Sequence, residues 1–544
     1  FPLLGNMLDQ AALDALVGGS GCDVESVYPL SPVQQGMLFH ALYSPDSEEY
    51  FTQSQFWFEG HVDEALLRQA WQAATDRFGV LRTWFGWNGL PEAVQVVLKH
   101  VDVPWASVDV SGSSDEHEAI AQLLADDRQR GFVLSEAPLM RFIFVRRSGG
   151  QFGLVWSSHH LLLDGWSLPI IMETVYGTYR QLARAEPVAD FGSVYPFANY
   201  IEWLGRQDND AAMAHWRDLL GSFDSPLSLR MLERGVGPCV FPQGDDVGYT
   251  SVERRVGAEA TAAVQQFARE HQVTANIALQ GLWATLLRFH TRQRDVVFGT
   301  TVSGRSNATL AGVETMVGIF INALPVRVLV DVDQPIGVFM QTLQAQQIAS
   351  QQYEFSSLAE VQRASGVAAG TSMFDVLFVF ENYSVAKMED EGESSVGVLK
   401  VREAETVEKT NFGLTLLAAV LGGELHLRMS FNSSVFDKYR VERMLDQLCS
   451  GVENIGAVGS VGDVCFASDA DLNAVEYEWN RTQASIPTEC RIHDLVREQS
   501  QRTPDAVACV YGDEHVSAGE FDVRTRLLAS FLQQCGVGLD GRVA

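Results

Sequence analysis

A histidine pair followed by an acidic turn is the stretch of this sequence most suggestive of chemistry. Ser157–Ser167 reads SSHHLLLDGWS, so His159 and His160 precede Asp164 and Gly165 by a short apolar run. A neutral imidazole can hold or accept a proton near pH 7, and an anionic neighbour can fix its tautomer or brace its loop. A lone histidine or a lone Asp-Gly is usually structural. Their combination predicts chemistry assisted by a histidine.

A strand and a helix are expected on either side of this motif. Residues 151–158 alternate and are rich in β-formers, which predicts a strand. Residues 166–182 carry apolar side chains at helical spacing, which predicts a helix. The histidines therefore lie where a strand ends and a loop turns toward a helix, a place where α/β scaffolds aim catalytic groups. Gly165 permits a tight turn, and the Asp164 carboxylate can accept hydrogen bonds that hold the loop.

No serine or cysteine has a recognisable context for a covalent nucleophile. The chain contains no GxSxG motif. Its seven cysteines are scattered, odd in number and without a CxxC pair, so we expect neither a disulfide framework nor a zinc site. The sequence therefore favours direct transfer assisted by histidine, and it assigns no metal ligands.

The composition argues against nucleic acid and membranes as partners. The 544 residues carry a formal net charge of −30, which repels phosphate backbones and anionic lipid. The nearest approach to a basic patch, RFHTRQRD at residues 288–295, is short. No apolar run reaches the ~18 residues of a membrane-spanning helix, and the N-terminus lacks the pattern of a secretion signal. We therefore expect a cytoplasmic protein.

Two stretches of similar size share a mixed α/β pattern. Helical patterns alternate with strand-like runs from residue 28 to about 187, and the same mixture recurs from about 199 to 460. The chain is too long for one core, since single cores stop growing at about 250 to 300 residues. No residue-level repeat links the stretches. The pattern predicts an α/β protein with two halves, followed by a tail of different character.

Several segments together resemble the condensation domains of nonribosomal peptide synthetases. The histidine motif matches the HHxxxDG signature of that family. Further matches follow in the family's order: YPLSPVQQGMLFH at 28–40, LRTWF at 81–85, DVVFGTTVSGR at 295–305, VGIFINALPVR at 317–327 and MFDVLFVFENY at 373–383. The tail, from WNRTQASIPTEC onward, resembles the start of an adenylation domain without its phosphate-binding loop or catalytic lysine.

The resemblance implies two lobes, each similar to chloramphenicol acetyltransferase, that form a V-shaped pseudo-dimer with a central tunnel. The implied domains are a linker or the end of a preceding carrier domain at 1–22, a condensation N-lobe at 23–195, a C-lobe at 196–460, a linker at 461–484 and the truncated start of an adenylation domain at 485–544. A monomer is expected, because the two lobes supply internally what related acetyltransferases obtain by oligomerising.

The resemblance also implies a reaction. An upstream carrier domain presents a peptidyl thioester on 4′-phosphopantetheine. The amine of an aminoacyl group on a downstream carrier domain attacks this thioester, with an adenylation domain in cis. No cofactor is expected to bind the chain itself. His160, the second histidine, acts on the amine either as general base or by positioning it, and the sequence leaves both roles open.

The same family implies supporting roles for further residues. His159 is expected to hold the loop, and the Gly165 amide to stabilise the developing oxyanion. Asp164 is expected to brace the motif through an ion pair, with Arg82 of LRTWF as the candidate partner. The residues expected to shape or support the cleft are Trp166, Ser303 and Asn322.

Related activities are distinguished by their own motifs. An epimerase of this superfamily would carry an EGHGRE-like motif, and a heterocyclase would have DxxxxD where HHxxxDG is intact here. A dual epimerising domain would carry an extra histidine motif near the N-terminus, where MLFHALYSPDSEEY offers His40 alone. Two alternatives stay open, a starter domain that transfers a fatty acyl group and a catalytically silent carrier-docking module. We favour condensation of an L-configured donor end with an L-acceptor.

Overall fold

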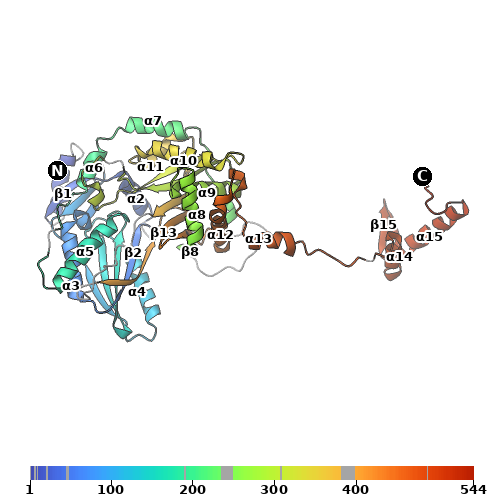
Figure 1. The fold of residues 1–544 in the computed structure, drawn as a ribbon, viewed down its shortest axis with the longest axis horizontal. Coiled ribbons are helices and arrows are strands. Elements are labelled where there is room, and N and C mark those ends of the chain that lie inside the picture. Colours follow the sequence, from blue (N-terminus) through green and yellow to red (C-terminus); the bar gives the residue numbers. More distant parts are fainter. Residues whose placement is uncertain are drawn as a thin grey trace. The chain divides into compact units, whose positions relative to one another are not determined.

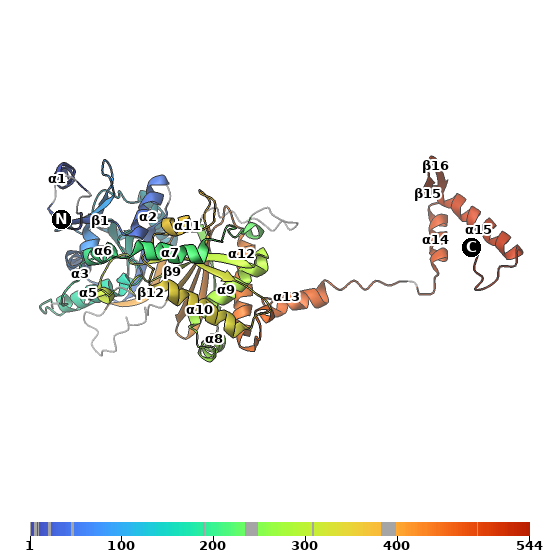
Figure 2. The same cartoon turned by 90° about the horizontal axis from the view of Figure 1, so that it is seen from above.

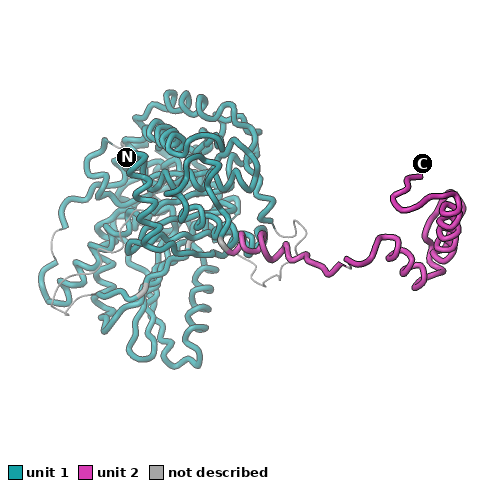
Figure 3. Tube along the Cα trace, turned by 45° about the vertical axis from the view of Figure 1, so that its right-hand side comes forward, with its two compact units in different colours: residues 1–468 teal, residues 469–544 magenta. Residues whose placement is uncertain are grey.

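The computed structural model describes residues 2–4, 8, 10–19, 23–44, 48–188, 191–233, 249–306, 309–381, 399–486 and 488–543. The chain divides into two compact units, Phe1–Ser468 and Asp469–Ala544 (Figure 3). This division falls inside the predicted 461–484 linker. Within the described ranges, no helix is long and apolar enough to cross a membrane.

The first half of the larger unit is built on a five-stranded sheet (Figure 1). Its strand order is β12 (Lys400–Glu408), β2 (Phe51–Glu59), β7 (Gln151–His159), β6 (Met140–Arg147) and β5 (Trp105–Asp109). Strands β5 and β6 are parallel, and the other neighbours are antiparallel. The motif strand β7 is therefore a central strand, paired on both sides.

Successive side chains of β7 point to opposite faces of this sheet, and apolar residues lie on both faces. Trp156 packs with Trp71 of α3 (Glu64–Arg77) in the main core of this half, to which α5 (Ser167–Ala183) contributes Val175. On the other face, Val155 packs with Ile120 of α4 (Glu116–Arg130) in a smaller cluster. Because successive strand residues face opposite sides, the local sequence of β7 decides which side chains reach each layer.

A three-stranded sheet in the order β1 (Val24–Pro29), β4 (Val94–Leu98) and β3 (Thr83–Gly86) adjoins this half. A 3₁₀ turn at Pro2–Leu4 and helix α1 (Gln10–Gly19) precede it, and Leu4 and Leu16 pack with Val27 and Val96 of the sheet. The described part of the predicted 1–22 linker is therefore packed on the domain. Ser20–Cys22 lie outside the described residues.

The second half contains a six-stranded sheet. Its order is β10 (Asn322–Leu329), β9 (Asp295–Val302), β11 (Val376–Glu381), β13 (Leu414–Leu421), β14 (Glu424–Asn432) and β8 (Tyr249–Val256). Helices gather on one side of it (Figure 2), namely α8 (Ala258–Glu270), α9 (Ala275–Thr291), α10 (Ile336–Gln351) and α12 (Lys438–Asn454). Helix α9 is buried over most of its length, with Trp283 fully enclosed. The opposite face of the sheet is thereby left for the site described below.

Three further helices, α6 (Ala198–Leu204), α7 (Asn209–Leu220) and α11 (Leu358–Ala364), lie outside the two layers described above. Helix α6 contributes Tyr200 to the core of the first half. Helices α7 and α11 pack together around Trp216 and Val361 in a separate cluster.

Helix α2 (Pro32–Tyr43) follows Ser31, its N-cap residue, which forms a capping box with Gln34.

Segments from the second half complete the first. Strand β12 pairs with β2 at the edge of the five-stranded sheet, from Lys400 opposite Glu59 to Glu408 opposite Thr52. Phe320, in the connection between β9 and β10, is buried in the core of the first half. The two halves are therefore interlocked rather than joined end to end.

The smaller unit is a compact α/β fragment. It contains α13 (Asp469–Asn473), a π-helical turn at Ala474–Glu478, α14 (Ile492–Arg502), the hairpin β15 (Val507–Tyr511) and β16 (Glu514–Ser517), and α15 (Ala518–Gln534). An ion pair of 3.9 Å joins Arg497 of α14 to Asp522 of α15.

Candidate active site

His159 ends the central strand β7 and His160 follows it, with their side chains on opposite sides. Trp156, Ser158 and His160 line a large cavity, whereas His159 is a buried residue that does not line it. This division follows from the alternation of strand side chains. The doubled histidine therefore places one ring in the cavity and the other in the protein interior.

The His160 ring has a defined tautomer. Its Nδ1 lies 2.8 Å from the carbonyl oxygen of Leu163, three residues later. A carbonyl can only accept, so Nδ1 carries the hydrogen, and the neutral ring has its lone pair on Nε2. The backbone N–H of His160 donates to the carbonyl of Tyr50 at 2.8 Å, which anchors the residue to the first half. The local geometry therefore presents a proton acceptor at Nε2.

His159 is held in the neutral form by its surroundings. The residue is only 6% exposed, and its Nδ1 accepts a hydrogen bond of 3.2 Å from the backbone N–H of Leu161. Burial lowers the pKa of His159 to about 3, with a further contribution from the neighbouring His160. The ring therefore stays uncharged at neutral pH, with a hydrogen bond that shapes the motif loop.

Both oxygens of the Asp164 carboxylate are occupied. Oδ1 accepts from the backbone N–H and the hydroxyl of Ser167, at 3.0 and 2.9 Å. Oδ2 accepts from the backbone N–H of Phe320 at 3.0 Å and from Nη1 of Arg305 at 2.7 Å. The carboxylate is therefore suited to brace the motif loop against the second half of the chain.

Arg305, and not Arg82, is the ion-pair partner of Asp164. The side chains of Arg305 and Asp164 are 3% and 0% exposed. The guanidinium also donates to the carbonyl of Met316 at 3.2 Å and lies 4.0 Å over the centre of the Phe320 ring. The sequence-based prediction of Arg82 is wrong, because contacts made elsewhere in the fold occupy that side chain.

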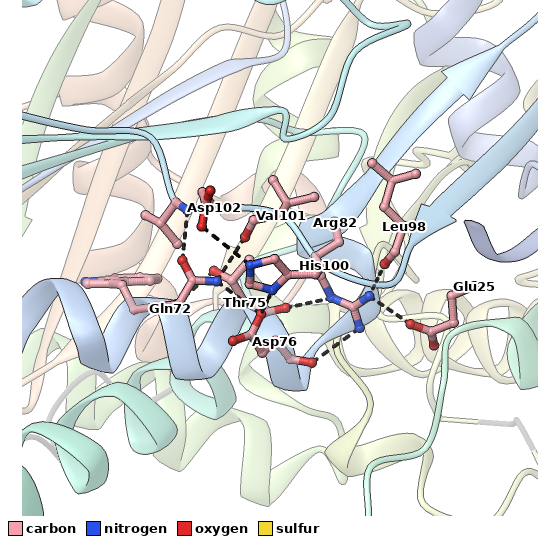
Figure 4. A network of polar contacts seen from close by, with 11 residues as sticks. Glu25, Gln72, Thr75, Asp76, Arg82, Leu98, His100, Val101 and Asp102 are labelled. Carbon is pink, nitrogen blue, oxygen red and sulfur yellow. Dashed lines mark hydrogen bonds and ion pairs between the residues drawn. The ribbon is translucent and has the colours of Figure 1, made fainter. Parts of the chain in front are cut away.

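Arg82 ties the helix α3 to the three-stranded sheet (Figure 4). Its Nε donates to the carbonyl of Thr75 at 3.0 Å, and Nη2 donates to that of Asp76 at 3.3 Å. Nη1 donates to the carbonyl of Leu98 and forms an ion pair of 2.8 Å with Glu25. A side chain held in this way supports the first half but does not contact the histidine motif.

The cavity beside His160 has a volume of about 1780 Å³ and is lined by both halves of the chain. The first sheet, with β12, and helices α2 and α5 form one part of the lining, and strands β8, β9, β11, β13 and β14 form another. Asp164, Gly165 and Trp166 line it next to the histidine. A space of this size can hold two extended groups that meet at His160.

Asn322 and Ser303 lie at the start of β10 and just after β9. Asn322 lines the cavity, and its Nδ2 donates to the carbonyls of Glu354 and Ser356, at 2.9 and 2.7 Å. The Ser303 hydroxyl accepts a hydrogen bond of 3.3 Å from the backbone N–H of Arg305. The structure thus places Asn322 at the cavity and Ser303 in the turn that carries Arg305.

A comparison with protein-family models decides the family. The model described as "Condensation domain" matches residues 24–461, which include the histidine motif and the three sheets of the larger unit. The chain belongs to the condensation-domain family. This membership confirms the predicted family and the enzyme class, since condensation domains are amide-bond-forming acyltransferases of nonribosomal peptide synthesis.

Peptide synthetases are among the relatives of this condensation domain. It is 38% identical over 545 residues to one of the linear gramicidin synthase proteins of Brevibacillus parabrevis, covering 99% of this chain and 7% of that protein. It is 31% identical to bacitracin synthase 3 of Bacillus licheniformis, covering 95% of this chain and 8% of that protein. The chain therefore spans less than a tenth of these two relatives.

Solved structures confirm the mixed α/β fold. A four-domain nonribosomal peptide synthetase bound to AMP and glycine matches with a TM-score of 0.70 at 18% identity, covering 95% of this chain and 39% of that chain. The first condensation domain of the calcium-dependent antibiotic synthetase matches with a TM-score of 0.67 at 16% identity, covering 82% of this chain and 100% of that chain.

Sequence reasoning missed Arg305 and Ser167 as site residues of the condensation domain. Both stand inside matched motifs, Ser167 three residues after Asp164 and Arg305 at the end of DVVFGTTVSGR. Their positions within these motifs could therefore have indicated both residues as members of the site. It did not reveal the pairing, because Asp164 and Arg305 are 141 residues apart.

Among the described residues, no group of three or more His, Cys, Asp or Glu side chains could hold a metal ion. The described cysteines, Cys449, Cys465, Cys490, Cys509 and Cys535, are free thiols. Cys22 and Cys239 lie outside the described residues.

Proposed function

We propose that this condensation domain joins a carrier-bound peptidyl thioester to the amine of a carrier-bound aminoacyl group. Both substrates are delivered on 4′-phosphopantetheine, the donor by an upstream carrier domain and the acceptor by a downstream one. The observation that carries the proposal is the position of His160. Its ring lines a cavity shared by both halves, and its Nδ1 is bonded to Leu163, so that Nε2 is the proton acceptor.

The reaction forms one C–N bond and breaks one C–S bond. The acceptor amine attacks the donor carbonyl, and the donor carrier leaves as a thiol, which takes up the proton that the amine loses. His160 Nε2 accepts that proton or orients the amine. An α-amino group has a pKa of about 8, so part of it is already neutral at pH 7. Positioning by His160 therefore contributes even where full proton abstraction is not required.

Four neighbouring groups support this step. The Gly165 amide is the proposed donor to the oxyanion, and Trp166 shapes the cavity wall that both residues line. The ion pair of Asp164 with Arg305 holds the loop that carries them. His159 supports the loop from the interior through its hydrogen bond with Leu161.

Hydroxyl groups in the cavity favour a peptidyl donor over a fatty acyl donor. Thr52 and Ser158 face each other across β2 and β7, and both line the cavity. On the second sheet, Thr415 and Ser430 face each other across β13 and β14 and line it as well. The hydroxyls of Thr52, Ser158 and Ser430 can donate to and accept from the peptide groups of a donor. The Thr415 hydroxyl already hydrogen-bonds to that of Thr410 at 3.0 Å. The opening motif and the histidine motif resemble those of the subclass that joins L-configured residues, so we propose an L-configured donor end and an L-aminoacyl acceptor.

The wider assembly is proposed from the family. Residues 23–195 and 196–460 form the two lobes of a V-shaped pseudo-dimer, and the shared cavity is its tunnel. Residues 1–22 connect to an upstream carrier domain, and 485–544 begin an adenylation domain in cis. The chain acts as a monomer within one polypeptide.

The test uses a donor dipeptide and an acceptor amino acid loaded on separate phosphopantetheinylated carrier domains. Intact-protein mass spectrometry follows the peptide on the acceptor carrier, with the wild type, His160→Ala, and His117→Ala as the matched control, since His117 is a residue of α4 that lies away from the cavity. We expect a tripeptide with the wild type and His117→Ala and a rate ~10² to 10⁴ lower with His160→Ala.

Other outcomes would overturn this proposal. Product from a fatty acyl donor, but none from peptidyl donors, would assign a starter domain. Binding of both carriers without product from either donor class would assign a catalytically silent docking module.

A further inference from the structure

Two arginines line the active-site cavity without a carboxylate partner among the described residues. Arg255 lies near the end of β8 and Arg402 near the start of β12, and both side chains are exposed. The neighbouring Arg428 of β14, by contrast, is paired with Glu253 of β8. The described contacts therefore leave Arg255 and Arg402 available to an anionic group that enters the cavity.

Arg255 belongs to a row of residues across the open face of the second sheet. It faces His426 across β8 and β14, and Ala419 of β13 and Glu381 of β11 continue the row. All four residues line the cavity. Neighbouring strands lie ~4.8 Å apart, so the backbone of Glu381 is ~14 Å from that of Arg255. The row therefore ends in a cation beside a histidine, well separated from its single acid.

Arg402 lies about one strand length from His160. The backbone N–H of His160 donates to the carbonyl of Tyr50 at 2.8 Å, and that of Tyr50 donates to the carbonyl of Lys409 at 3.1 Å. His160 therefore lies beside the residue that follows β12. Arg402 precedes Lys409 by seven residues, which is ~20 Å along a strand with one register irregularity.

Arg255 lies at a similar distance along the other wall. The Tyr249 hydroxyl lies 3.3 Å from the hydroxyl oxygen of Thr410, the residue after Lys409. Arg255 follows Tyr249 by six residues on β8, again ~20 Å along a strand. Arg402 belongs to the first sheet and Arg255 to the second. Cations therefore line both walls of the cavity at the same end.

This distance matches the reach of phosphopantetheine. About 13 bonds separate its sulfur from its phosphorus, and an extended chain advances ~3.5 Å for every three backbone bonds, so the arm spans ~15 Å. The length of an arginine side chain covers the remainder. The chain as a whole carries a net charge of −30, which repels a phosphodiester, so local cations are needed where such a group enters.

We propose that Arg255 and Arg402 bind the phosphodiester of one carrier-bound phosphopantetheine at this end of the cavity. The proposal rests on the proposed function, since it assumes that the substrates arrive on phosphopantetheine. A guanidinium stays charged and presents paired N–H donors that match phosphate oxygens. The opposite end is lined by α2, where His40 Nε2 lies 3.4 Å from Asn411 Nδ2. The two arginines therefore hold one of the two arms and not the other.

The first experiment measures condensation kinetics while each carrier is varied in turn. Arg255→Gln and Arg402→Gln each remove one cation, and Arg269→Gln is the control, because Arg269 is an exposed residue of α8 that does not line the cavity. We expect both cavity variants to raise the KM for the same carrier ~5-fold, the size expected for an exposed ion pair, with kcat and the KM for the other carrier unchanged. Unchanged KM values, or equal rises for both carriers, overturn the proposal.

The second experiment identifies the anion. The affected carrier is replaced by a small thioester of the same acyl group, either on 4′-phosphopantetheine or on pantetheine, which lacks the phosphate. The ratio of wild-type to Arg255→Gln kcat/KM should be ~5 with phosphopantetheine and ~1 with pantetheine. An equal ratio with both thioesters shows that the arginine holds another group and overturns the proposal.

The third experiment does not depend on activity. Fluorescence anisotropy measures the binding of a labelled carrier domain with and without its phosphopantetheine arm. Arg255→Gln should weaken binding of the form with the arm and leave the form without it unchanged. Equal weakening of both forms assigns the arginine to the carrier surface and overturns the proposal. Weakening of the arm-bearing form alone, with no condensation from any donor, supports the phosphate site and assigns the failure to the proposed function.

Discussion

Arg305 and Asp164 form a buried ion pair of 2.7 Å that connects the turn after β9 to the histidine motif. Their side chains come from the two halves of the chain, and the Phe320 backbone N–H shares the same carboxylate oxygen. The histidine loop of this condensation domain is therefore held by the other half of the molecule. We therefore expect loss of this contact to lower both stability and activity.

Replacing Arg305 should destabilise the larger unit strongly. Arg305→Ala leaves the Asp164 charge buried without its cation, which typically costs about 3 to 5 kcal/mol. The control is Arg294→Ala, because the side chains of Arg294 and its partner Asp331 are 64% and 42% exposed, and such pairs contribute at most about 1 kcal/mol. Denaturant midpoints measured by tryptophan fluorescence check this order. Equal shifts for the two variants would contradict the buried-pair argument.

Arg82 should matter for stability through its backbone acceptors rather than through its ion pair. Arg82→Ala leaves the buried carbonyls of Thr75 and Leu98 without their donor, at a cost of about 1 to 3 kcal/mol for each unsatisfied group. Glu25→Gln should cost about 1 kcal/mol or less, since the Glu25 side chain is 50% exposed. Thermal unfolding of both variants measures the difference. A larger effect from Glu25→Gln would refute this assignment.

His159 should make the domain less stable in mild acid. Its folded pKa of about 3 lies below the ordinary value of 6.5, so the folded state binds fewer protons than the unfolded state. This contribution is present above pH 6.5 and is lost as pH falls. His159→Gln should lose about 1.5 kcal/mol less than the wild type between pH 6.5 and pH 5. Urea midpoints at both pH values test this, with His117→Gln of α4 as the control. Identical slopes for the wild type and His159→Gln would exclude the effect.

The substitution Asn322→Asp should lower the stability of the domain, and more at pH 8 than at pH 5. Asn322→Asp removes the donors to the carbonyls of Glu354 and Ser356 and brings an anionic oxygen toward them, at a cost of about 2 to 4 kcal/mol. At pH 5 the loss should be smaller, because a protonated carboxyl can donate one hydrogen bond. Melting temperatures at pH 5 and pH 8 measure both values. Asn209→Asp, at an exposed helix start, is the control, and an equal response in the two variants would disprove the donor role.

Local pattern predicted many elements of this fold closely. The run DVVFGTTV predicts a strand over residues 295–302, and β9 spans Asp295–Val302. The helical stripe predicted over 166–182 corresponds to α5 at Ser167–Ala183. Helices and strands are recognised from the spacing of apolar side chains over a short stretch of chain. Neighbouring residues are therefore sufficient to predict these elements.

Pairing across the chain was harder to predict. Arg82 and Arg305 both stand in matched motifs, and nothing local distinguishes them as partners for Asp164. The choice depends on where the turn after β9 lies, which in turn depends on how the β9–β10 connection enters the core of the first half.

The sequence by itself determined the family, through motifs in the family's order, and the strand–loop–helix setting of the histidine motif, because both depend on neighbouring residues. The separate roles of the two histidines stay a prediction from the family resemblance. Only the tertiary structure decided that Arg305 balances Asp164 and that both halves line one cavity. These contacts join residues far apart in the chain. They stabilise the folded protein only when the two halves pack into one unit, with β12 of the second half paired to β2 of the first sheet.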